Sequence, residues 1–152
     1  MERYLVWGVV ALGIGVAQAA TLQLSRTELC ELSSKVLVGE VSSQETRWSS
    51  EGAGAIERVV WVSVSTDVKG PPTSSVEVVL PGGQLQGVGH WVEDTPRLIE
   101  NGRYLLFLQP IEGRWFVTGG EQGAIRLTPQ GARVGETEAD ALASVGACNV
   151  SR

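Results

Sequence analysis

After its first twenty residues, the chain alternates short apolar runs with breaks rich in glycine and proline, which indicates many short strands. The clearest strand is 58–68, where Val60, Val62 and Val64 face one way and the residues between them face the other. Residues 103–109 form the most continuously apolar run and are predicted to be a central strand. Four further strands bring the expected number to about six: 35–43, 75–80, 114–118 and 124–127.

The breaks between these strands carry residues that favour turns. Glu112-Gly113 predicts a tight turn between two hairpin strands. Pro81-Gly82-Gly83 predicts another turn, followed by a loose, glycine-punctuated segment that reaches Trp91. Gly39, inside the first strand, predicts a bulge or a point where another part of the chain approaches closely.

A short helix is predicted near each end of this β-rich region. Ser25 and Glu28 have the spacing of a capping box, and Thr137 and Asp140 have capping spacing at the start of a helix over 137–145. Strands at close spacing with two short helices favour a mainly β fold. We expect a small barrel of the oligonucleotide/oligosaccharide-binding (OB) shape, with a β-sandwich as the alternative.

The first twenty residues predict an export signal. Arg3 precedes an apolar run from about Tyr4 to Val16, and Ala17-Gln18-Ala19 supplies the small residues that a signal peptidase recognises. The run is shorter than the roughly 20 apolar residues that span a bilayer, so no retained membrane span is expected. We therefore expect a signal peptide at 1–20, one β-rich domain at 21–152, and a secreted or periplasmic location.

Cys30 and Cys148 are the only two cysteines of the chain. An exported protein with an even pair of cysteines is expected to oxidise them to each other. Nothing in the sequence indicates the neighbouring base that a reactive thiol needs. We therefore predict a structural disulfide that ties the two terminal helices together.

Charge and residue counts exclude several classes of function. The net charge of −5 argues against a nucleic-acid partner, because such proteins carry a basic face. One histidine and two cysteines are too few for a zinc site, so neither a metal nor a cofactor is expected. A hydrolase would have to use His90, the only imidazole, and no serine lies in a Gly-x-Ser-x-Gly elbow.

The tryptophans offer better candidates for a binding site. Trp61 and Trp115 lie inside predicted strands, so core packing explains them. The other two lie at loop-like positions, where an aromatic side chain on a rigid β scaffold either anchors a partner or covers the end of the barrel. The candidate binding residues are Trp48 and Trp91 with their neighbours Arg47 and His90, and the partner would be a protein or a glycan.

Four segments follow one another in a recognisable order: 34–41, Asp67-Val68-Lys69-Gly70, Leu80-Pro81-Gly82-Gly83 and 96–108. This order resembles small exported bacterial β domains of unassigned function, over about residues 25 to 128. The shared segments are turns of a scaffold, so the resemblance implies export and a β fold but no activity.

A weaker likeness is to the netrin-like inhibitor domains, which combine an OB-type barrel with a terminal helix and a disulfide. Those that block metalloproteases begin their mature chain with a cysteine, whereas here the expected start is Ala20 or Thr21. The likeness therefore implies a fold and not that mechanism. The sequence favours a non-catalytic exported domain that binds another macromolecule. The alternatives are a hydrolase using His90 and a structural component of the envelope.

Overall fold

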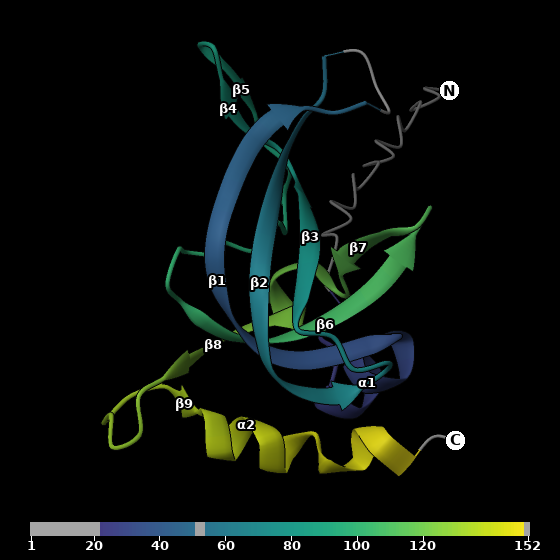
Figure 1. The fold of residues 1–152 in the computed structure, drawn as a ribbon, viewed down its shortest axis with the longest axis vertical. Helices are drawn as coiled ribbons and strands as arrows, with labels where there is room; N and C mark the ends of the chain where they lie inside the picture. Colours follow the sequence, from purple (N-terminus) through teal and green to yellow (C-terminus); the bar gives the residue numbers. More distant parts are fainter. Residues whose placement is uncertain (1–21, 51–53, 151–152) are drawn as a thin grey trace, which may run out of the picture.

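The computed structural model describes residues 22–50 and 54–150, so the predicted export signal lies outside the described residues. The chain is mainly β, with a short α-helix near each end, as predicted (Figure 1). Among the described residues, no helix is long and apolar enough to cross a membrane. The elements are α1 (Arg26–Leu32), β1 (Lys35–Trp48), β2 (Ile56–Lys69), β3 (Ser75–Pro81), β4 (Gly83–Leu85), β5 (Val88–His90), β6 (Arg103–Ile111), β7 (Arg114–Val117), η1 (Gly120–Gly123), β8 (Ala124–Thr128), β9 (Glu136–Thr137), α2 (Glu138–Ser144) and η2 (Gly146–Val150).

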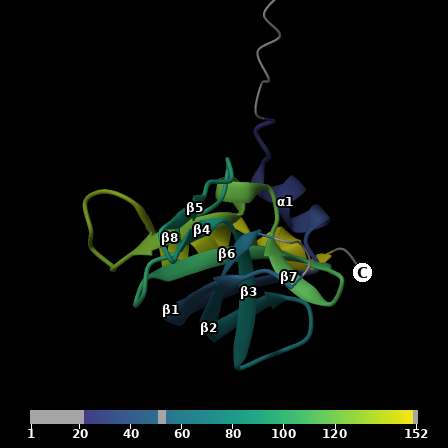
Figure 2. The same ribbon diagram turned by 90° about the horizontal axis from the view of Figure 1, so that it is seen from above.

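Seven of the strands form one mixed sheet in the order β1-β2-β3-β7-β6-β8-β9, and β1 also pairs with β6. The pairs are antiparallel except β3 with β7 and β8 with β9. β6 pairs with β1, β7 and β8, which confirms that this apolar run is central. Seen from above, the loop 129–135 between β8 and β9 projects to one side of the molecule (Figure 2).

The core consists of two hydrophobic clusters on opposite faces of β1 and β6. Leu37 and Leu106 belong to the cluster that also holds Val60 and Val62 of β2. Their strand neighbours, such as Val36 and Phe107, belong to the second cluster, which includes residues of both α-helices. Because successive side chains of a strand point to opposite faces, a strand between two clusters must be apolar throughout. This explains why β6 reads as a continuous apolar run.

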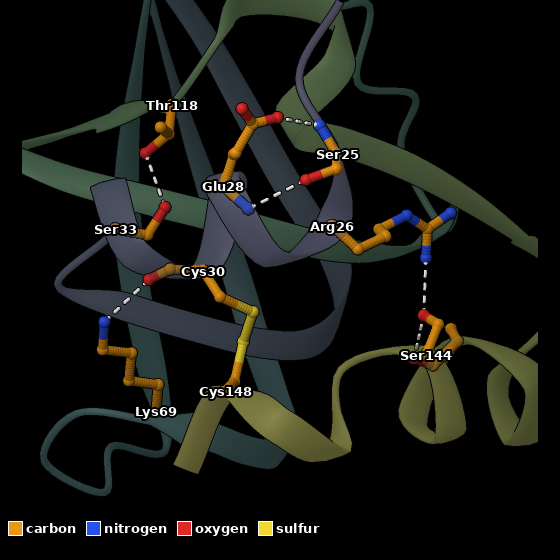
Figure 3. The surroundings of a disulfide bond; sticks show 10 residues. Ser25, Arg26, Glu28, Cys30, Ser33, Lys69, Thr118, Ser144 and Cys148 are labelled. Atoms are coloured by element: carbon orange, nitrogen blue, oxygen red, sulfur yellow. Dashed lines mark hydrogen bonds between the residues drawn. A yellow bond between two sulfur atoms is a disulfide. The ribbon is translucent and has the colours of Figure 1, made fainter. Parts of the chain in front are cut away.

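The predicted helix caps are both confirmed. The Ser25 Oγ accepts a hydrogen bond from the Glu28 N–H at 3.1 Å, and the Ser25 N–H donates to the Glu28 carboxylate at 2.7 Å (Figure 3). At the start of α2, the Thr137 Oγ1 accepts a hydrogen bond from the Asp140 N–H at 3.3 Å. These caps satisfy amide groups that the first turn of a helix leaves unpaired.

The predicted disulfide between Cys30 and Cys148 is present (Figure 3). Cys30 lies on α1 and Cys148 on η2, with their Cα atoms 5.3 Å apart, and both side chains are buried in the second cluster. The bond spans 118 residues of sequence and closes the N-terminal helix onto the C-terminal one. Lys69 of β2 donates from Nζ to the Cys30 carbonyl oxygen at 2.7 Å, which fixes α1 against the sheet.

Two local predictions are wrong. The segment after Pro81-Gly82-Gly83 is not a loose loop, because β4 and β5 pair there as a small antiparallel hairpin. Trp61 is half-buried and belongs to neither hydrophobic cluster, whereas Trp115 packs partly against the first, as expected. Trp61 pairs with Ser43 and Glu77, so its neighbours on that face are polar.

Gly39 lies where the register of β1 against β2 shifts, as the sequence predicts. A methyl group at this position would lie 2.5 Å from Val62 Cγ1 and 2.7 Å from the Ser63 carbonyl oxygen. Replacing Gly39 by alanine is therefore expected to lower the free energy of unfolding by about 1 to 3 kcal/mol, because the strands must separate locally. Urea unfolding measures the change. Gly89→Ala is the control, since a methyl group there has open space, and equal stability of the two variants would contradict the expectation.

Candidate functional site

The four candidate binding residues lie around the end of the β1–β2 hairpin where β1 ends and β2 begins, but they point to different faces. Arg47 pairs with Glu57 across the two strands, and Trp48, the last residue of β1, pairs with Ile56. Because neighbouring strand residues point in opposite directions, Arg47 and Trp48 face opposite sides of the hairpin. His90 ends β5, and its Nδ1 accepts a long hydrogen bond of 3.5 Å from the Ile56 N–H.

Arg47 is engaged in an ion pair instead of being available as an anchor. Its Nε lies 3.0 Å from the Glu57 Oε1, and Arg114 of β7 reaches the same oxygen at 2.7 Å. The Glu57 side chain is only 6% exposed. Burial alone would raise the pKa of Glu57, but the hydrogen bonds and positive charges of Arg114 and Arg47 hold this pKa below its usual value.

The lowered pKa of Glu57 predicts a pH-dependent contribution to stability. A carboxylate whose pKa is depressed in the folded state stabilises the fold at neutral pH, and this contribution disappears as the pH falls through the folded-state pKa. Replacing Glu57 by glutamine is expected to lower the free energy of unfolding by about 1 to 3 kcal/mol at pH 7 and much less near pH 3. Urea unfolding at both pH values tests this. The exposed Glu45→Gln is the control, and a Glu57→Gln loss of equal size at both pH values would contradict it.

His90 and Trp91 line a cleft of about 490 Å³. The lining residues come from β4, β5 and neighbouring segments, and the hairpin of β4 and β5 lies at the end of the molecule away from α2 (Figure 1). The size of the cleft is that of a site for a small molecule or for one group of a larger ligand. It is lined by Arg58, Pro81, Gly82, Gly83, Gln84, Gly89, His90, Trp91, Val92, Thr95 and Arg97.

One wall of the cleft depends on the glycines that follow β3. The Gly82 N–H donates to the Ile56 carbonyl oxygen at 2.7 Å, and Gly82 has a φ of +85°, which side chains rarely tolerate. A methyl group on Gly82 would lie 2.7 Å from the His90 carbonyl oxygen, so glycine lets the two strands of the hairpin approach. The two strands are joined by the two-residue turn Gln86-Gly87, with positive φ at both positions, a geometry that favours glycine.

The opposite wall is the segment that leads from Trp91 back to β6. Pro96 and Leu98 are buried on either side of Arg97. The Tyr104 hydroxyl accepts a hydrogen bond from the Ile99 N–H at 2.9 Å and donates to the Arg97 carbonyl oxygen at 3.4 Å. The backbone of Arg97 is therefore held in place while its side chain stays exposed at the cleft.

Two guanidinium groups share this cleft without a carboxylate. Among the described residues, neither Arg58 nor Arg97 forms a side-chain hydrogen bond or ion pair, and the buried Nε of Arg58 has no hydrogen-bond partner. Burial lowers the pKa of Arg58, and the nearby positive charge of Arg97 lowers it further. None of the described lining residues is acidic.

Sequence reasoning missed both arginines, although one signal was present. Arg58 lies in phase with Val60 and Val62, so the alternation of β2 places a charged side chain on the face that is otherwise apolar. Such a residue is expected to have a polar partner. Arg97 carries no comparable signal, because only the fold brings it beside Arg58.

The exposed tryptophan at the cleft is Trp91, with 85% of its surface accessible. Trp48 is less exposed, at 41%, and is not among the lining residues. The cleft thus brings together His90 and Trp91 with two unforeseen arginines, while Trp48 and Arg47 lie outside it.

Similarity to known proteins assigns no ligand to this cleft. No family model matches the sequence, and no curated protein matches it either. Over residues 22–50 and 54–150, no three histidine, cysteine, aspartate or glutamate side chains are grouped so that they could hold a metal ion. The chemistry available is that of two guanidinium groups, an imidazole, an indole, and the amide and hydroxyl groups of Gln84 and Thr95.

Proposed function

We propose that this protein is an exported, non-catalytic domain that binds another macromolecule through the cleft beside Trp91. The observation that carries this proposal is the indole of Trp91, 85% exposed at the edge of the cleft. Leaving so much of a tryptophan in water forgoes the stabilisation of its burial, and tryptophan is enriched among residues that dominate binding energy. A ligand seated in the cleft would cover this surface.

The proposal includes an OB-like barrel as the scaffold. The pairing of β1 with β6 links the sheet back on itself, so the ladders run β1-β2-β3-β7-β6 and return to β1. This cyclic order, with one parallel pair between β3 and β7, supports an OB-like barrel over a sandwich of two separate sheets. The cleft then lies at one end of the barrel, and the disulfide-linked helices cover another part of it.

Export is part of the same proposal. A disulfide between Cys30 and Cys148 persists in oxidising surroundings such as the periplasm or the extracellular medium. This supports the export signal predicted at 1–20.

Two alternatives have less support. Hydrolysis by His90 would need a nucleophile and a group that orients the imidazole. The described residues lining the cleft include no serine, cysteine or carboxylate, and the Thr95 hydroxyl donates to the Val92 carbonyl oxygen at 2.9 Å. A structural envelope component without a discrete ligand would not explain why an exposed indole stands beside a cleft.

Replacing Trp91 by alanine is expected to weaken partner binding by about 2 kcal/mol or more and to leave the fold intact. The oxidised protein is immobilised and exposed to culture fluid and envelope extract from the producing cells. The retained protein and glycan are quantified, and the binding of each is then titrated. Val134→Ala is the matched control, because Val134 is also 85% exposed but lies in the projecting loop 129–135.

Comparison with Trp48→Ala separates the two tryptophans. The proposal predicts that Trp48→Ala binds like the native protein, because Trp48 does not line the cleft. A folded Trp91→Ala variant that retains the same partner with native affinity would contradict the proposal. So would a partner whose binding depends on Val134.

A further inference from the structure

The cleft holds two positive charges that no acidic side chain among the described residues pairs with. Arg58 projects from β2 and Arg97 from the segment between Trp91 and β6, and both line the same cleft. In a chain of net charge −5, their guanidinium groups have no acidic partner among the described residues. Two like charges facing one space repel each other, and the repulsion is relieved when an anion binds between them.

Because both cations are guanidinium groups, they favour one chemical class of anionic ligand. A guanidinium group presents several N–H donors in one plane and matches the two oxygens of a carboxylate. The terminal Nη groups of Arg58 have no hydrogen-bond partner among the described residues, and unlike the Nε they are not buried away from the cleft. A ligand carboxylate would supply the acceptor that these donors lack.

The rest of the cleft suits a hydroxylated ring better than a peptide. Gly83 and Gly89 line the cleft without side chains, and the backbone of Gly89 is exposed, so hydroxyl groups of a ligand can approach it. The exposed face of Trp91 provides a flat apolar surface beside them. A peptide ligand would need apolar pockets or a long strand edge, whereas β4 and β5 have only 3 residues each.

Resting on the proposed function, we propose that the cleft binds an acidic polysaccharide. The guanidinium groups of Arg58 and Arg97 pair with the carboxylate of a uronic acid residue, and the Trp91 indole packs against the sugar ring. His90 and Gln84, at the rim, are placed to form hydrogen bonds with hydroxyl groups.

Titration of defined probes tests this inference. The probes are an oligogalacturonate, a neutral maltooligosaccharide of the same length, and an oligoglutamate of the same charge, each added to the purified oxidised protein. Calorimetry gives the affinity, and tryptophan fluorescence reports contact with an indole. The inference predicts that the oligogalacturonate binds, that its affinity falls with added salt, and that the other two probes bind at least about tenfold more weakly.

Variants of Arg58 and Arg97 show whether these two side chains bind the oligogalacturonate. Arg97→Met is expected to weaken oligogalacturonate binding by about tenfold or more, because a charge-assisted pair is lost. The fold is expected to persist because Arg97 is held through its carbonyl oxygen and by its buried neighbours. Arg126→Met is the matched control, since Arg126 is an exposed arginine of β8 outside the cleft. Arg58→Met provides a second test at the other charge and is expected to give a similar loss.

Each contrary outcome has a distinct meaning. Failure of the oligogalacturonate to bind, or binding that Arg97→Met and Arg58→Met leave unchanged, would overturn the inference. Equal binding of the oligoglutamate would overturn it in favour of an acidic peptide. Binding of the neutral oligosaccharide that depends on Trp91 but not on the arginines would overturn it and leave the proposed function standing. The proposed function itself fails on a different result, namely partner capture that does not depend on Trp91.

Discussion

Replacing Cys30 and Cys148 together by alanine is expected to lower the free energy of unfolding by about 4 to 5 kcal/mol. The disulfide closes a loop of 118 residues, so its loss frees almost the whole described chain in the unfolded state. It also removes the crosslink that holds α1 directly against η2. Urea unfolding of the double variant and of the native protein measures the difference.

Two controls accompany this measurement. The native protein should show no titratable thiol before reduction and two afterwards, because Cys30 and Cys148 are the only cysteines. Reduced native protein should unfold like the double alanine variant. A loss of less than about 1 kcal/mol would show that packing in the second cluster, without the crosslink, holds the ends together.

Replacing Asp67 by alanine is expected to cost about 3 to 5 kcal/mol, because it leaves a buried lysine without its counter-charge. The Lys35 side chain is only 2% exposed, and its Nζ lies 3.2 Å from the Asp67 Oδ1 and 2.6 Å from the Pro71 carbonyl oxygen. Asp67 also accepts a hydrogen bond from the Thr73 N–H at 3.3 Å. The pair thus connects the start of β1 to the β2–β3 turn.

A double-mutant cycle with Lys35→Met tests whether the unpaired charge of Lys35 causes this loss of stability. Methionine fills most of the same volume without a charge, so Lys35→Met and the double variant should both be more stable than Asp67→Ala alone. Urea unfolding of the four proteins gives the coupling free energy. Simple additivity of the two substitutions, or a loss below about 1 kcal/mol for Asp67→Ala, would contradict the account.

The sequence predicted the features that depend on local patterns. Apolar alternation located β2, the continuous apolar run located the central β6, and the spacing of Ser25 with Glu28 located α1. Gly39 was correctly identified as a bulge and close approach. These features were accessible because each is encoded within a few neighbouring residues.

The candidate site was only partly predictable, because it is assembled from distant segments. Trp91 and His90 stood out as an aromatic and an imidazole in a glycine-rich region, and both line the cleft. Trp48 was expected in a loop, yet β1 extends to it, since pairing with β2 continues beyond the apolar residues. Arg97 reaches the cleft only because Pro96 and Leu98 are buried and fix the segment there. No pattern of neighbouring residues predicts that Arg97 lies beside the cleft.

Site-specific photo-crosslinking shows directly whether a macromolecule binds at the cleft beside Trp91. A photoreactive residue replaces the exposed Gln84, which lines the cleft, or Gln130, an exposed glutamine of the projecting loop, in the producing cells. A partner bound in the cleft should give a discrete macromolecular adduct from position 84 that disappears when Trp91 is replaced by alanine, and none from position 130. An adduct of equal yield from position 130, or none from position 84 while a partner is still retained, would contradict binding at the cleft.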